Sequence, residues 1–100
     1  MALQITNNSG ILEINGNLNS QNTNSFNNYF NALLESTNFI TISLNNVVEM
    51  DINGLNTIVG LYKKALTKNS IFYIIGQENQ RVVDLFNAEK LNYLLRKDVA

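Results

Sequence analysis

The spacing of apolar residues predicts that the chain opens with a β-hairpin. Leu3 and Ile5 alternate with polar residues, and residues 11–14 form a short apolar run, so both segments have the pattern of short strands. The Asn and Gly residues at 7–10 are typical of the tight turn that joins two such strands. A polar connection at 17–23 then separates this hairpin from the next element.

Two later segments have apolar residues at the intervals of an amphipathic helix. The first set consists of Phe26, Phe30, Leu33 and Leu34. The second set consists of Leu55, Ile58, Val59, Tyr62 and Leu66. We expect the first helix to end near Ser36 and the second to begin with Asn53 as its N-cap. Lys63, Lys64 and Lys68 lie near the expected end of the second helix, where cations complement the helix dipole.

Strands are predicted between and after these helices. Residues 39–44 alternate apolar and hydroxyl side chains, and residues 70–75 form an apolar run that stops at Gly76. A third helix is expected over 79–89, and 91–95 is expected to form a strand or a final helical turn. Since parallel neighbours need helical crossovers and hairpin neighbours do not, this order predicts an α/β fold. We expect a mixed sheet of about four to five strands, with the helices packed mainly on one face.

Length and charge narrow the range of functions. The 100 residues suffice for one domain, which we expect to span 1–100. Seven Lys and Arg against eight Asp and Glu give a net charge of −1, which lacks the clustered cations of nucleic-acid-binding proteins. No signal-peptide pattern and no apolar run near the ~20 residues of a membrane span are present. We therefore expect a cytoplasmic protein with no direct membrane insertion.

The chain has no histidine and no cysteine. Ser–His and Cys–His nucleophile pairs and the usual zinc sites therefore cannot form. The glycine-rich motifs that cradle phosphates are missing as well. These absences predict a protein that is not an enzyme and that uses no metal and no cofactor.

Two carboxylates, Glu49 and Asp51, precede the second predicted helix. A helix start presents unpaired backbone N–H groups and the positive end of the dipole, so Asp51 is suited to capping that end. In a second interpretation Glu49 and Asp51 form a pair for acid–base chemistry or hold Mg²⁺, although two carboxylates without a third ligand make a poor metal site.

The run Asp51-Ile52-Asn53-Gly54-Leu55 resembles the D-S-[ST]-G-L motif of STAS domains. That family includes bacterial anti-sigma factor antagonists and cytoplasmic domains of sulphate transporters. The Ser or Thr that is phosphorylated in the family corresponds to Ile52, which has no hydroxyl. The resemblance therefore implies a domain that is not phosphorylated at the usual site, with Thr57 as the nearest downstream hydroxyl that could substitute.

Two other segments are similar to the family pattern. Gly16-x-Leu18 resembles its G-x-L-D motif, with Asn19 in place of the Asp, and Val82-x-x-Leu85-Phe86 resembles its closing helix. The order of predicted elements also agrees with a STAS domain over nearly the whole chain.

The resemblance implies a non-catalytic regulatory domain that binds a protein in bacterial signalling and regulates transcription as an anti-sigma factor antagonist. Its partner would be an anti-sigma factor or a serine-kinase-like protein. The residues expected to contact that partner are Asp51, Ile52, Asn53, Gly54 and Leu55. One alternative within the family is the STAS subunit of a lipid-transport ATPase complex. An alternative from another class is a small-ligand binder or an enzyme that uses Glu49 and Asp51.

Overall fold

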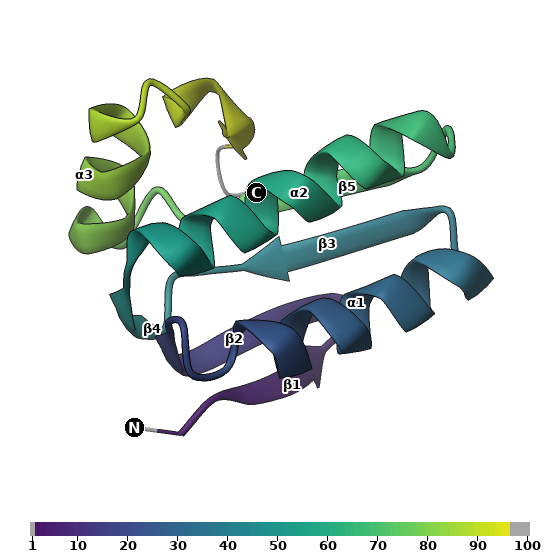
Figure 1. Ribbon diagram of the computed structural model, residues 1–100, viewed down its shortest axis with the longest axis horizontal. Coiled ribbons are helices and arrows are strands. Elements are labelled where there is room, and N and C mark those ends of the chain that lie inside the picture. Colours follow the sequence, from purple (N-terminus) through teal and green to yellow (C-terminus); the bar gives the residue numbers. More distant parts are fainter. Residues whose placement is uncertain (1, 97–100) are drawn as a thin grey trace.

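The computed structural model describes residues 2–96 and contains a mixed β-sheet with two helices side by side on one face (Figure 1). The first residue and residues 97–100 of the expected domain lie outside the described residues. The strands are β1 (Gln4–Asn8), β2 (Ile11–Leu18), β3 (Phe39–Ser43), β4 (Val47–Met50), β5 (Ile71–Ile75) and β6 (Leu95–Arg96). The helices are α1 (Thr23–Ser36), α2 (Ile52–Thr67) and α3 (Gln80–Ala88), with a 3-10 turn η1 (Asn92–Leu94).

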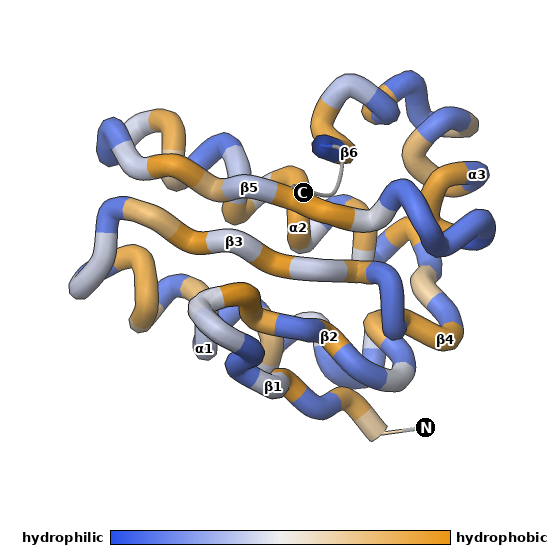
Figure 2. Tube along the Cα trace, turned by 180° about the vertical axis from the view of Figure 1, so that it is seen from behind, coloured by the Kyte–Doolittle hydropathy of each residue, from blue (hydrophilic) through white to orange (hydrophobic). Residues whose placement is uncertain are grey.

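The sheet has the order β1-β2-β3-β5-β6, and β4 pairs with the end of β2. β1 and β2 are antiparallel, and all the other pairs are parallel. In Figure 2, β2, β3 and β5 lie in front of α1 and α2, so within residues 2–96 no helix covers the face of the sheet seen there. The predicted α/β class and the packing of helices on one face are confirmed. The sheet has six strands, because β4 and β6 are short additions to the four that the pattern predicted most clearly.

The core lies between the sheet and the pair α1 and α2. Phe26 and Phe30 of α1 are fully buried, with ring centroids 4.7 Å apart, and Phe30 lies 6.0 Å from Phe72 of β5. On α2, Leu55 and Ile58 are fully buried as well. The 3.6-residue apolar period predicted both helices because these side chains share one face of each helix.

The hairpin turn consists of Ser9 and Gly10, which both have positive φ angles of 55° and 89°. A two-residue turn of this kind matches the twist of the strands that it joins. Asn7 supports it by accepting a hydrogen bond from the Gly10 N–H at 3.0 Å. The predicted hairpin is therefore confirmed.

β2 runs past Gly16 and pairs with two different strands. Residues 11–13 pair with β3, and residues 16–18 pair with β4 after a register shift at Gly16. The φ angle of Gly16 is 95°, and a Cβ there would lie 2.0 Å from the Ala2 carbonyl oxygen, so this position requires glycine. The predicted polar connection at 17–23 was therefore too long, and β4 was not predicted as a strand.

The start of α2 differs from the prediction. The N-cap is Asp51, not Asn53, and the helix begins at Ile52. The Asp51 backbone is extended, and its side chain accepts a hydrogen bond from the Gly54 N–H at 2.9 Å, which is the geometry of an N-cap residue. Residues 52–54 are thus the first helical turn, whereas a cap at Asn53 would have placed Ile52 before the helix.

Gly54 packs against the end of β2. A Cβ on Gly54 would lie 2.4 Å from the Leu18 carbonyl oxygen and 3.0 Å from the Leu18 Cγ. Gly60, six residues later on α2, is exposed, and a Cβ built on it would have no neighbouring atom within 4 Å. The two glycines of one helix therefore meet opposite surroundings.

We expect Gly54→Ala to lower the free energy of unfolding by about 1–3 kcal/mol, because the helix start must move away from β2. Gly60→Ala is the matched control, and it should raise that free energy by roughly 0.5–1 kcal/mol because Ala is favoured over Gly inside a helix. Urea unfolding of both variants measures the difference. Changes of the same sign would contradict the packing described here.

Candidate functional site

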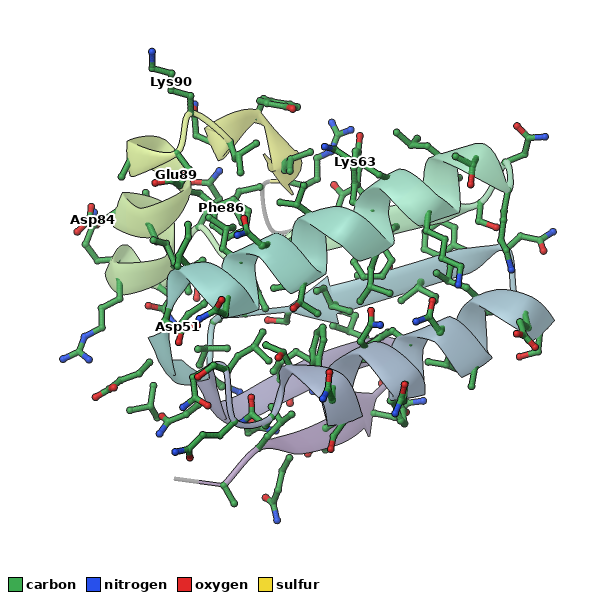
Figure 3. All side chains as sticks on the ribbon, viewed as in Figure 1. Asp51, Lys63, Asp84, Phe86, Glu89 and Lys90 are labelled. Atoms are coloured by element: carbon green, nitrogen blue, oxygen red, sulfur yellow. The ribbon has the colours of Figure 1, made fainter. Side chains whose placement is uncertain are left out.

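Asp51 connects three segments at the start of α2 (Figure 3). One carboxylate oxygen accepts from the Gly54 N–H at 2.9 Å, and the other accepts from the Ser20 N–H at 3.3 Å. The Asp51 N–H itself donates to the Leu18 carbonyl oxygen at 3.3 Å. The end of β2, the loop before α1 and the start of α2 are therefore held together by one residue.

The loop before α1 is organised by asparagine side chains. Asn22 accepts from the Asn19 N–H at 2.9 Å and donates through Nδ2 to the Asn17 carbonyl oxygen at 2.7 Å. Asn19 accepts from the Gln21 N–H at 2.9 Å. Asn19, which stands where the family motif has Asp, thus shapes the turn that presents Ser20 to Asp51.

Another asparagine, Asn79, fixes the other side of the site. It caps α3 by accepting from the Val82 N–H at 3.4 Å, and its Nδ2 donates to the carbonyl oxygens of Leu44 at 2.9 Å and Val47 at 2.8 Å. Arg81 also donates to the Val48 carbonyl oxygen at 3.2 Å. These bonds attach the start of α3 to β4 and to the loop that precedes it.

The charge state of Asp51 follows from its contacts. Partial burial raises the pKa of this carboxyl, but the N–H groups of Gly54 and Ser20 and the side chain and backbone of Asn53 outweigh that effect. The pKa of Asp51 therefore lies below its usual value, and the group is a carboxylate at neutral pH.

The five residues predicted to contact a partner differ in accessibility. Ile52 is 42% exposed and Asn53 is exposed, whereas Gly54 is buried and Leu55 has 0% of its surface exposed. The last two belong to the packing of α2: Leu55 lies on the buried face of the helix, and Gly54 packs against Leu18. Val48 of β4, which was not among the five, is 41% exposed. Partner contact by this segment stays a prediction.

Thr57, the alternative hydroxyl, is already bonded within the helix. Its Oγ1 donates to the Asn53 carbonyl oxygen at 2.9 Å, and the residue is half-buried. Ser20, by contrast, is exposed and adjoins Asp51. Sequence reasoning missed Ser20, because its proximity to Asp51 spans 31 positions; the only signal was its place just after the segment similar to G-x-L-D.

The Glu49 and Asp51 pair receives no support as a catalytic or metal site. Both oxygens of Asp51 accept from backbone N–H groups, and Glu49 is exposed on β4. Within residues 2–96, no group of three or more acidic, His or Cys side chains is arranged to hold a metal ion. In the same part of the chain, no helix has the length and apolar character needed to cross a membrane.

We expect Asp51→Ala to lower the free energy of unfolding at neutral pH by about 0.5–2 kcal/mol, because it removes the cap. The pKa of Asp51 is lower in the folded state, so the charged carboxylate stabilises the fold above its unfolded-state pKa of roughly 3.9. That contribution is lost as the pH falls through the folded-state pKa. The difference between the wild type and the variant should therefore shrink below about pH 4.

Urea unfolding at neutral and acidic pH measures this difference. Asp51→Asn is the control, because its side-chain oxygen can still accept from Gly54 and it should lose less stability at neutral pH. A loss from Asp51→Ala that is equal at both pH values would contradict the role of the charge.

Solved structures with the same fold include three that cover nearly all of this chain. The anti-sigma factor antagonist SpoIIAA in its unphosphorylated form is 12% identical, with a TM-score of 0.79 over 98% of this chain and 89% of that chain. An anti-sigma factor antagonist from Mycobacterium paratuberculosis is 16% identical, with a TM-score of 0.69 over 99% and 86%. The protein TM1081 from Thermotoga maritima is 20% identical, with a TM-score of 0.73 over 98% and 81%.

At these identities the likeness shows the fold alone. No curated protein shows significant sequence similarity to the chain. The family model of the STAS domain matches residues 1–98. With the fold, the helix start at Asp51 and this match in agreement, the chain belongs to the STAS domain family.

Proposed function

We propose that this protein is a non-catalytic regulatory adaptor of the anti-sigma factor antagonist type, which binds a protein partner at the first turn of α2. Its partner is an anti-sigma factor or a serine-kinase-like protein, and the complex forms in the bacterial cytoplasm and regulates transcription. Membership of the STAS family and the fold shared with anti-sigma factor antagonists support this proposal.

The observation that carries the proposal is the exposed apolar side chain of Ile52 at the start of α2. Ile52 is 42% exposed, and Val48, four residues earlier, is 41% exposed. Single exposed apolar residues are ordinary on protein surfaces, but these two flank the N-cap residue Asp51 in the sequence. A partner that buries them gains roughly 25 cal/mol for each Å² of apolar surface removed from water.

The rigidity of this surface also favours binding. Asp51 fixes Ile52 through the first helical turn, and Asn79 holds the β4 side through two carbonyl oxygens. A surface that is ordered before binding loses less conformational entropy when the complex forms. Ile52 has no side-chain hydroxyl to accept a phosphoryl group, so phosphorylation at this position does not release the complex. The amount of complex then depends on the abundance of the partner.

We expect Ile52→Asp to weaken binding to a purified serine-kinase anti-sigma factor from the same bacterium by at least about tenfold, because a charge would have to be desolvated in the contact. Leu66→Asp is the matched control: Leu66 is 56% exposed near the other end of the same helix, and its change should leave the affinity unaltered. Isothermal titration calorimetry gives both affinities. Equal effects of the two changes would argue against a contact at Ile52, and binding only to a transporter ATPase subunit would favour the lipid-transport alternative.

A second prediction concerns phosphorylation. Incubation with the same kinase and ATP should add one phosphate to Ile52→Ser and none to the wild-type chain, because only the variant has a hydroxyl at position 52, which corresponds to the phosphorylated residue of the family motif. The added charge should then weaken binding through repulsion and desolvation. Intact-mass measurement and peptide mapping test this directly. Phosphorylation of the wild-type chain at Thr57 or Ser20, with loss of binding, would show that the switch has moved.

A further inference from the structure

The face of the sheet opposite α1 and α2, which is turned toward the viewer in Figure 2, includes exposed apolar residues. Side chains alternate along each strand, so the odd-numbered residues of β3 and β5 point to this face, while Ile40, Ile42, Phe72 and Ile74 point into the core. Phe39 is 58% exposed and Ile71 is 53% exposed. The face is also hollowed, with Ile11, Thr41 and Tyr73 among the residues that line the hollow.

The register of the strands arranges these residues in rows across the sheet. Phe39 pairs with Ile71 in one row. Thr41 lies between Ile11 and Tyr73 in the next row. The third row crosses four strands and consists of Glu13, Ser43, Ile75 and Arg96.

The third row has opposite charges at its two ends. Glu13 on β2 and Arg96 on β6 are separated by three strand spacings, or about 14 Å, which is too far for an ion pair within one chain. Glu13 accepts a hydrogen bond from the Asn8 Nδ2 at 3.4 Å, and the Arg96 guanidinium lies 5.8 Å from the centre of the Tyr73 ring. Both charges thus lie at the two ends of the row that contains Ser43 and Ile75.

We propose that this face binds a second copy of the chain, with a twofold axis parallel to the strands between β3 and β5. That axis exchanges β3 with β5 and β2 with β6, so Glu13 of each copy faces Arg96 of the other. Phe39 then meets Ile71 of the second copy, and Thr41 meets Tyr73. The interface lies on the opposite side of the sheet from the helices and goes beyond the adaptor function proposed above.

Charge complementarity is the reason for a second copy as the occupant. A twofold interface brings the same patch of both chains together, so a patch is self-complementary only when opposite charges lie at positions that the axis exchanges. Glu13 and Arg96 occupy such positions at the two ends of the third row. Aligned packing of two twisted sheets keeps strand directions within about 30°, which preserves the row-to-row contacts near the axis.

The dimer should be weak, because a face of four or five short strands lies at the low end of specific interface sizes. Sedimentation velocity of the full chain from about 5 to 500 µM should show a monomer–dimer equilibrium. Glu13→Lys and Arg96→Glu should each weaken the dimer at least about tenfold, since each places like charges face to face. The double variant Glu13→Lys/Arg96→Glu should restore the wild-type affinity to within about threefold, because the pairs are re-formed with exchanged signs.

Phe39→Lys should also abolish the dimer, while Leu66→Lys, which alters an equally exposed residue on α2, should leave it unchanged. Circular dichroism melting checks that each variant is folded.

A chain that stays monomeric at the highest concentration, whether or not it binds a small molecule or another protein on this face, would overturn the proposal. A double variant as weak as the single ones would overturn it as well. Partner binding through Ile52 should be the same in all of these variants, so the two proposals can fail separately.

Discussion

The candidate site depends on the close approach of the first turn of α2 to the last residue of β2. The Leu18 carbonyl oxygen accepts from the Asp51 N–H at 3.3 Å and would be 2.4 Å from a Cβ on residue 54. Because Gly54 has no side chain, the helix can start against the strand, and Asp51 can reach the Ser20 N–H as well as its own cap. Without this close approach, the first turn of α2 would not hold the Ile52 side chain in one orientation.

Most of the fold could be predicted because burial imposes a period on the sequence. The two long helices and strands β3 and β5 follow from apolar residues that recur at fixed intervals on one face. β4 could not be predicted in this way. Its four residues pair with β2 across a register shift at Gly16, and that shift depends on backbone conformation and not on the pattern of residues 47–50.

The motif located the candidate site, but it did not show which of its side chains are accessible. Gly54 and Leu55 lie inside the domain, because both belong to the buried face of α2. Ser20 and Asn79 were not recognised, because they act through hydrogen bonds to residues 31 and 35 positions away. Such contacts can be identified only from the three-dimensional structure, in which segments far apart in the chain lie at the same edge of the sheet.

The asparagine side chains in the loops around the site affect how these loops respond to salt and pH. A carboxamide both donates and accepts hydrogen bonds, carries no charge and does not titrate. The turns held by Asn19, Asn22 and Asn79 are therefore insensitive to the salt concentrations and pH changes that weaken ion pairs. The same amides make these turns vulnerable to deamidation, which is a slow chemical change. Deamidation of Asn79 to Asp would keep an acceptor for the α3 cap but remove the donor for the carbonyl oxygens of Leu44 and Val47. The loss of a single amide nitrogen would therefore remove two of the hydrogen bonds that attach the start of α3 to β4 and to the loop that precedes it.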